Sequence, residues 1–155
     1  MTSIQERIQL LRKNGLKITP QRRRLLEMLN DDQSHPTAEQ VYQRLLLDMP
    51  DVSRTTVYNT LHELVRLGKL VPVEAISEHG LRYDSNTHDH HHLLCLGCHQ
   101  LVDIQDNFEG VILPTEKAGG YQVLKYQVTF SGYCPDCQIS SRDQHASRSS
   151  QDKPA

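Results

Sequence analysis

Two Cys-x-x-Cys pairs constrain the fold of this chain more than any other feature of its sequence. Cys95 and Cys98 form the first pair, Cys134 and Cys137 form the second, and 35 residues lie between them. Four thiolates are a ligand set that Zn²⁺ binds in a closed tetrahedral site, which leaves no open position for catalysis. We therefore predict a structural zinc ion that holds together a small β-rich domain. Two redox-active or disulfide-bonded pairs are the alternative.

Charged residues are distributed unevenly along the 155 residues of the chain. Residues 1–72 carry 11 Lys and Arg against 8 Asp and Glu, whereas residues 73–155 carry 6 against 11. Seven of the nine histidines also follow residue 78. The basic first half and the acidic, ligand-rich second half indicate two functions on one chain.

Membrane insertion and export are not expected from the sequence. No apolar run approaches the roughly 18–20 residues of a membrane span. The first residues lack the basic and then apolar pattern of a secretory signal. A cytoplasmic location is therefore predicted, and in that compartment cysteines act more often as thiolates than as disulfides.

The first half of the chain has helical periodicity, interrupted by capping residues. Thr19 (followed by a proline), Thr37 and Ser53 occupy N-cap positions, and Gly68 ends the last helix. The pattern then changes to alternation over residues 70–73 and 81–83, which predicts two short strands joined by a loop at residues 78–80. Three helices followed by a β-hairpin are the element order of a winged helix-turn-helix domain. We place this domain at residues 1–84.

The helix that follows Ser53 has an apolar face and a polar face. Val57, Leu61 and Leu64 form the apolar stripe. Arg reads guanine edges and Asn reads adenine edges, and the second helix of a helix-turn-helix presents such side chains to the major groove. A solvated polar surface is the alternative for any one of them. The candidate DNA-binding residues are Arg54, Thr55, Tyr58 and Asn59, with Lys17, Arg22 and Arg23 as phosphate contacts.

The second half of the chain is predicted to consist mainly of strands. Residues 91–95 and 101–104 flank a Cys-x-x-Cys turn, and residues 121–130 alternate with one slip that a β-bulge would cause. A short helix is predicted between residues 107 and 119. We therefore assign an α+β fold, with a hinge at residues 85–89, a metal-binding domain at residues 90–137 and a disordered Ser-rich tail at residues 138–155.

A second group of potential metal ligands surrounds the His-rich segment at residues 88–92. If the chain from His90 is extended, His90 and His92 share one face, and His91 points to the other. Imidazoles combined with the carboxylates of Asp84 and Asp103 suit Fe²⁺, Mn²⁺ or Zn²⁺. An incidental solvated His cluster is the alternative.

The same ligands would suit a metalloenzyme that activates water for hydrolysis. However, the sequence places no general base beside the cluster and signals no substrate pocket. The upstream winged helix fits regulation better, so no enzymatic activity is predicted. His35, considered alone before a proline, is a loop residue or a helix cap.

In combination, these motifs resemble the ferric uptake regulator (Fur) family over about residues 4–137. The resemblance implies a homodimer that binds a pseudo-palindromic DNA operator through N-terminal winged helices. It also implies a C-terminal α/β dimerisation domain and metal-dependent repression. The matching segments are residues 17–22, 35–39, 53–61, 82–84 and 90–92, together with both Cys-x-x-Cys pairs.

Within that family, the chain most resembles the peroxide-sensing repressors. Those proteins hold a regulatory Fe²⁺ or Mn²⁺ between their domains with three His and two Asp, and His35 and His90 match the histidines that peroxide oxidises. Asp103 and Asn59 favour this branch, because iron sensors tend to have Glu and Arg there. An iron- or zinc-sensing repressor is the alternative. The resemblance assigns the regulatory metal to His35, Asp84, His90, His92 and Asp103.

A third metal site occurs in many iron sensors of the family, and here its ligand set is incomplete. Asp89 and His91 lie where two of its ligands would be, but Tyr126 occupies the position of an expected His. The resemblance therefore implies a structural zinc site and a regulatory Fe²⁺ or Mn²⁺ site, and it gives a third site no complete set of ligands.

Overall fold

The chain forms two separate units in the computed structural model, which describes residues 3–74, 80–106, 108, 113–124 and 126–139. The first unit spans Met1–His88 and the second spans Asp89–Ala155. The boundary between them lies within the segment expected to be a hinge, residues 85–89. In the described parts of the chain, no helix has both the length and the apolar character that a membrane crossing requires.

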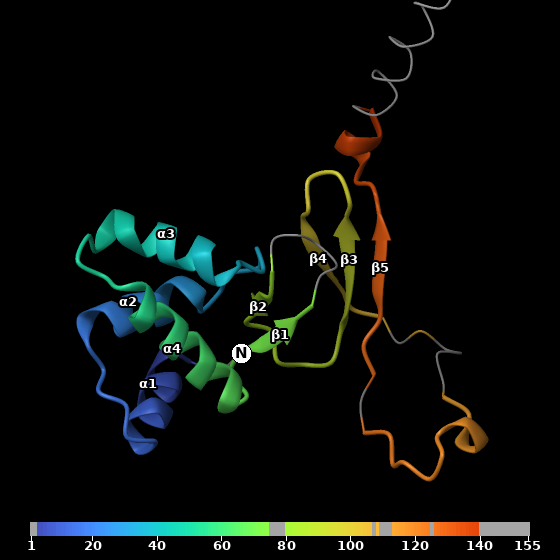
Figure 1. Cartoon of the computed structure of the whole chain (residues 1–155), viewed down its shortest axis with the longest axis horizontal. Coiled ribbons are helices and arrows are strands. Elements are labelled where there is room, and N and C mark those ends of the chain that lie inside the picture. The colour runs from blue at the N-terminus through green and yellow to red at the C-terminus, as the bar shows by residue number, and fades with distance from the viewer. Residues whose placement is uncertain (1–2, 75–79, 107, 109–112, 125, 140–155) are drawn as a thin grey trace, which may run out of the picture. The chain divides into compact units, whose positions relative to one another are not determined.

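The first unit begins with four helices (Figure 1). A Ser or Thr hydroxyl caps each of them and accepts a hydrogen bond from the backbone N–H three residues later. The three predicted caps are confirmed, and Ser3 adds a fourth. At Thr37, the side-chain oxygen of Gln40 also accepts a hydrogen bond from the Thr37 N–H, which completes a capping box. The helices are α1 Ile4–Lys13, α2 Pro20–Leu29, α3 Ala38–Asp48 and α4 Arg54–Arg66.

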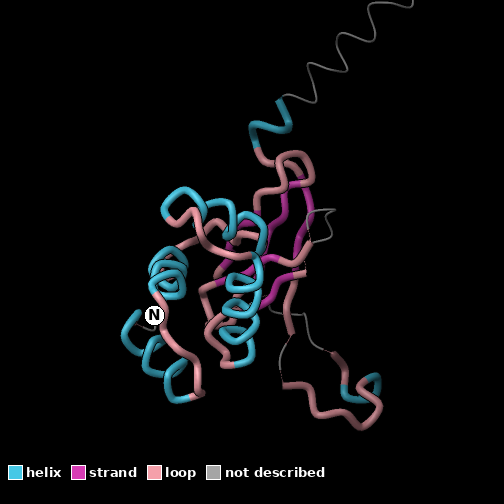
Figure 2. Tube along the Cα trace, turned by 60° about the vertical axis from the view of Figure 1, so that its left-hand side comes forward, coloured by secondary structure: helices cyan, strands magenta, loops and turns pink. Residues whose placement is uncertain are grey.

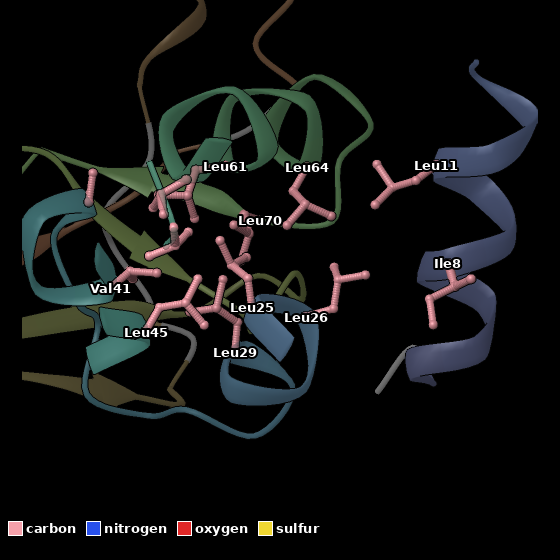
Figure 3. Close-up of a cluster of buried hydrophobic side chains, with 13 residues drawn as sticks. Ile8, Leu11, Leu25, Leu26, Leu29, Val41, Leu45, Leu61, Leu64 and Leu70 are labelled. Carbon is pink, nitrogen blue, oxygen red and sulfur yellow. The ribbon is translucent and has the colours of Figure 1, made fainter. Parts of the chain in front are cut away.

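Aliphatic side chains from all four helices form the core of this unit (Figure 3). The apolar stripe predicted for α4 is confirmed, because Val57, Leu61 and Leu64 are all completely buried. Burial of such side chains is the main favourable term in folding. The labelled members of the core in Figure 3 are Ile8, Leu11, Leu25, Leu26, Leu29, Val41, Leu45, Leu61, Leu64 and Leu70.

A β-hairpin completes the first unit. Strand β1, Val71–Val73, pairs antiparallel with β2, Arg82–Asp84, so that Val71 lies opposite Asp84. The three helices α2, α3 and α4 followed by this hairpin confirm the predicted element order of a winged helix-turn-helix, and α1 precedes them. Of the loop predicted at residues 78–80, residues 78 and 79 lie outside the described part of the chain.

The second unit is built on a three-stranded sheet (Figure 1). Strand β3, His91–Cys95, lies in the middle. It pairs antiparallel with β4, Leu101–Ile104, and parallel with β5, Thr129–Gly132. Both strands predicted around the first Cys-x-x-Cys turn are confirmed at their bounds, and so is the predicted α+β class.

The strand predicted over residues 121–130 was wrong in extent. Of the described residues in this stretch, only residues 129 and 130 belong to a strand, β5, and residues 121–124 and 126–128 lie outside helices and strands, as Figure 2 shows. Tyr121 and Val123, two members of the alternating pattern, are 82% and 52% exposed, so these positions do not mark a face packed within the chain. The side-chain pattern alone therefore could not locate the strand, because pairing depends on a distant partner.

Two short helical segments accompany the sheet. A 3₁₀ helix, η1 Thr115–Lys117, falls within the helix predicted between residues 107 and 119; residues 107 and 109–112 lie outside the described part of the chain. A helical turn covers residues 135–139 after β5. Residues 138 and 139 of the expected tail belong to this turn, and residues 140–155 are not among those described.

Candidate metal centres and DNA-recognition helix

The four cysteines come together at one end of the sheet of the second unit. Cys95 ends β3 and lies opposite Gly132 of β5. Because β3 and β5 are parallel, their carboxyl ends lie at the same end of the sheet. Cys98 follows β3 there, and Cys134 and Cys137 follow β5. The sulfur atoms of Cys95, Cys98, Cys134 and Cys137 all lie within 4.8 Å of one another, and none forms a disulfide.

The spacing of the sulfurs fits a tetrahedral zinc ion. Sγ of Cys98 and Sγ of Cys134 are 3.8 Å apart. Two sulfurs bound to one Zn²⁺ at about 2.3 Å in tetrahedral geometry are also about 3.8 Å apart. A single cluster of four sulfurs, instead of two separate pairs, favours structural zinc over independent redox or disulfide pairs.

Backbone N–H groups stabilise the ionised form of one of these cysteines. Hydrogen bonding by the N–H groups of Cys134 and Cys98 lowers the pKa of Cys95 to about 5, and the Cys134 N–H lies 3.3 Å from its Sγ. By contrast, the adjacent sulfurs of Cys134 and Cys95 raise the pKa of Cys137 to about 12. Four thiolates in this volume repel one another, so a bound divalent cation would offset their charge.

A glycine makes the close approach of the two pairs possible. A Cβ added to Gly97 would lie 2.7 Å from Sγ of Cys137 and 2.9 Å from its Cβ. Both the carbon–sulfur and the carbon–carbon contact are shorter than non-bonded atoms tolerate, so the second cysteine pair would have to move. The sequence motif treats this position as variable, and the requirement for glycine emerges only in three dimensions.

The first unit places two of the predicted regulatory ligands side by side. Nε2 of His35 lies 3.7 Å from Oδ1 of Asp84, and both side chains are buried. His35 belongs to the segment between α2 and α3, and Asp84 ends β2. These residues are 49 positions apart in the sequence, and the hairpin brings them together.

Strand β2 also holds the backbone around His35. Nη1 of Arg82 donates to the carbonyl oxygen of His35 at 3.1 Å, and the N–H of Tyr83 donates to the carbonyl oxygen of Pro36 at 3.0 Å. His35 has a φ of 48°, in the left-handed region. For a residue other than glycine this conformation costs on the order of 1 kcal/mol and persists where surrounding bonds enforce it. Arg82 therefore helps to fix the position of His35, a role that sequence reasoning missed.

The second unit brings the other three predicted regulatory ligands together. Nε2 of His90 lies 3.1 Å from Nε2 of His92, and Oδ1 of Asp103 lies 3.5 Å and 3.7 Å from these two nitrogens. His92 and Asp103 are opposite each other in the β3–β4 register. Adjacent donors of an ion bound at about 2.1 Å are roughly 3.0–3.5 Å apart, so these atoms suit a shared cation.

Gln127 supports this second group of ligands and was not anticipated. Its side-chain amide lies 2.9 Å from Nδ1 of His92. A partner at the far nitrogen orients a ligating imidazole and tunes its basicity. No spacing rule points to Gln127, because it lies 35 residues away on the connection that precedes β5.

His91 is packed as an aromatic ring. Its ring centroid lies 5.0 Å from that of Phe108 and 5.5 Å from that of Tyr126, and its Nδ1 accepts a hydrogen bond from the Val128 N–H at 3.2 Å. As predicted for an extended chain, it faces away from the side on which His90 and His92 meet Asp103. Tyr126, which stands where iron sensors have a His, thus stacks on His91.

The predicted DNA-reading side chains lie on the exposed side of α4. Arg54, Thr55, Tyr58 and Asn59 are all exposed, whereas Val57 faces the core. Of the predicted phosphate contacts, Lys17 and Arg23 are also exposed. Arg22 is half-buried, and its Nη1 donates to the Lys17 carbonyl oxygen at 2.7 Å.

Substitution of Gly97 by Ala should disrupt the sulfur cluster, because the new methyl group would overlap Cys137. We expect a G97A variant to lose zinc to a competing chelator at least about tenfold more readily, in the range seen when the support of a metal ligand is removed. Zinc release followed with a metallochromic dye measures this. Gly132→Ala is the matched control, since no atom lies within 4 Å of the Cβ added there. Equal zinc retention in the two variants would contradict the assignment.

Known proteins resemble this chain over most of its length. The peroxide-responsive repressor PerR of Staphylococcus aureus is 33% identical over 136 residues, which are 87% of this chain and 91% of that protein. The structure of PerR from Streptococcus pyogenes is 28% identical with a TM-score of 0.51 and covers 89% of this chain and 95% of its own.

The ferric uptake regulator Fur of Helicobacter pylori, whose structure is described as having three functional metal binding sites, has a TM-score of 0.69. It is 23% identical and covers 87% of this chain and 91% of its own. Residues 13–131 match the ferric uptake regulator family. The chain therefore belongs to the ferric uptake regulator family and is a metal-responsive, DNA-binding transcription regulator.

Proposed function

We propose that this protein is a metal-dependent repressor that senses hydrogen peroxide through oxidation of a histidine in its regulatory metal site. The observation that carries the proposal is the His90, His92 and Asp103 cluster, a nitrogen and oxygen donor set whose carboxylate is that of an aspartate. The likeness to the PerR repressors, which extends over most of the chain, supports it.

The regulatory ion is proposed to be shared between the two units. The first unit contributes His35 and Asp84, and the second contributes His90, His92 and Asp103. Neither group alone offers more than three protein ligands, so we propose that one ion binds to both. Such an ion would fix a single orientation of the DNA-binding domain (1–84) relative to the dimerisation domain (90–137), which are joined by the hinge at residues 85–89. The ion shifts the equilibrium only by the difference in its affinity for the two arrangements.

On DNA, the protein is proposed to act in the cytoplasm as a homodimer on a pseudo-palindromic operator. The two α4 helices would enter successive major grooves. Arg54, Thr55, Tyr58 and Asn59 would meet base edges or the backbone. Lys17, Arg22 and Arg23 would contact phosphates, which gives the binding its salt dependence.

Peroxide would end repression by removing a ligand. When bound, Fe²⁺ would catalyse electron transfer from the imidazole to peroxide, so that the ring is the net reductant, whereas Mn²⁺ would occupy the site with little reaction. The imidazole of His35 or His90 gains one oxygen atom from peroxide, and water is the other product. The oxidised ring is a poorer donor, so the preference for the DNA-competent arrangement falls.

An iron- or zinc-sensing repressor is the second candidate function. The nitrogen and oxygen donor set accepts Fe²⁺, Mn²⁺ and Zn²⁺ alike, with affinities that follow metal type and availability. Operator binding by the Mn²⁺ and Fe²⁺ forms, each with and without peroxide, separates the two. A peroxide sensor loses operator affinity only in its Fe²⁺ form.

Substitution of His35 by Ala should weaken operator binding without unfolding the protein. We expect the Mn²⁺-loaded H35A variant to bind a duplex selected by the wild-type protein at least about tenfold more weakly, because one side of the shared site loses a ligand. Fluorescence anisotropy measures the affinity, and a thermal melt monitors the fold. His88→Ala, an exposed hinge histidine, is the control. Unchanged operator affinity in H35A would refute the shared site.

Removal of the Arg82 guanidinium should lower the affinity for the regulatory metal. The Arg82 side chain is buried and holds the backbone carbonyl of His35. We expect Arg82→Gln to weaken Mn²⁺ binding about 10- to 100-fold, as is typical when the support of a metal ligand is lost. Calorimetric titration with Mn²⁺ measures this, with Arg24→Gln, an exposed ion-pair variant, as the control. Equal Mn²⁺ affinity in both variants would argue against the positioning role.

Exposure of the Fe²⁺ form to hydrogen peroxide should add one oxygen atom to a peptide that contains His35 or His90. The expected modification reflects their position as ligands to a metal that reduces peroxide. Mass spectrometry of digested protein detects it, and the Mn²⁺ form treated in parallel should remain unmodified. Oxidation confined to the four cysteines would point instead to a thiol switch.

A further inference from the structure

The guanidinium group of Arg54, the first residue of α4, is held by two side chains of α3. Its Nε donates to Oε2 of Glu39 at 3.2 Å, and its Nη2 donates to Oε1 at 2.9 Å. Its Cζ lies 4.4 Å from the centre of the Tyr42 ring. A two-bond fork and an aromatic face together restrict both the plane and the direction of the guanidinium.

Glu39 is itself restrained on α3. Nε2 of Gln43, one helical turn further along, donates to Oε1 of Glu39 at 2.7 Å. Hydrogen bonds from Arg54 and then from Gln43 lower the pKa of Glu39, so the carboxylate stays ionised at neutral pH. Gln43, Glu39 and Arg54 thus form a continuous chain of hydrogen bonds from α3 to the start of α4.

Stability does not account for this arrangement well. The side chains of Arg54 and Glu39 are 59% and 46% exposed. Exposed ion pairs contribute little to folding because water screens them and ordering two long side chains costs entropy. Instead, the contacts fix the orientation of the Arg54 guanidinium on the exposed face of α4.

The two hydrogen bonds to Glu39 leave the opposite edge of the Arg54 guanidinium to bind another partner. Glu39 bonds along the Nε side of the guanidinium. The outer edge, formed by Nη1 and the second hydrogen of Nη2, presents two parallel N–H donors. Guanine offers two matching acceptors, N7 and O6, in the major groove, and residues at the start of a recognition helix contact base edges.

We propose that Glu39, assisted by Tyr42 and Gln43, is a positioning residue that orients Arg54 so that its outer edge reads a guanine in each operator half-site. This inference rests on the proposed DNA-binding role of α4 and adds a determinant of specificity that lies outside that helix. Glu39 itself does not touch DNA in this arrangement. Its effect passes through Arg54.

Another Arg–Glu pair on α4 provides a matched comparison. Nε and Nη2 of Arg66 both donate to one oxygen, Oε2, of Glu63, three residues away on the same helix. That pair lies at the far end of α4, and both of its side chains belong to that helix. Loss of Glu63 should therefore leave base preference unchanged.

The test selects DNA from a pool of duplexes with randomised half-sites, using full-length protein loaded with Mn²⁺. Four proteins are compared: the wild type, Glu39→Gln, Arg54→Ala and Glu63→Gln. We expect the wild type and E63Q to share one strongly preferred guanine per half-site. In E39Q and R54A the preference at that position should fall about tenfold, the scale of one lost two-bond base contact, with preferences elsewhere kept. The double variant E39Q/R54A should match R54A.

Three outcomes would overturn the proposal. A uniform gain in affinity of E39Q with unchanged base preference would make Glu39 a competitor of the DNA phosphates. A uniform loss in R54A would make Arg54 a phosphate contact. A wild-type protein without any base preference would overturn the DNA-reading role of α4, and the positioning role with it. Thermal melts of each variant separate these results from a loss of fold.

Discussion

The sulfur cluster is the constraint on which the second unit depends most. Among the described residues of this unit, the buried hydrophobic side chains are Leu94, Cys95 and Leu101. So few buried apolar side chains provide little hydrophobic stabilisation against the conformational entropy of the chain. A cation bound by four sulfurs at the shared ends of β3 and β5 would provide the missing stabilisation, and its binding free energy would then contribute directly to folding. The first unit differs, because a core contributed by all four helices stabilises it.

Each of the two units brings together proposed metal ligands that are far apart in the sequence, and each does so in a different way. In the first unit, β2 carries Asp84 and bonds to the backbone around His35. In the second unit, the β3–β4 register sets His92 opposite Asp103. In both, a strand bears one ligand and also positions another. Strands of only three to five residues can therefore position a whole group of potential metal ligands.

Features encoded by neighbouring residues could be predicted from the sequence. Thr37 and Ser53 predicted the starts of two helices, because capping depends on side chains within one turn. The helical spacing of apolar residues predicted the buried face of α4. The spacing within the two Cys-x-x-Cys pairs predicted a zinc site. Residues that act through distant partners escaped notice: Arg82 reaches His35, Gln127 reaches His92, and Glu39 reaches Arg54. The prediction of a strand over residues 121–130 was wrong for the same reason, because the bounds of β5 depend on its pairing with β3 and not on the alternation of apolar residues.

Strand β3 ends in a cysteine, and this position has a consequence for the imidazoles at its other end. A shift of β3 by one residue would turn His91 toward Asp103 and move His92 to the opposite face, because side chains alternate along a strand. The same shift would pull Cys95 out of the sulfur cluster. A zinc ion bound by the four sulfurs would therefore fix the register of β3, and its loss would permit the shift that separates His92 from Asp103.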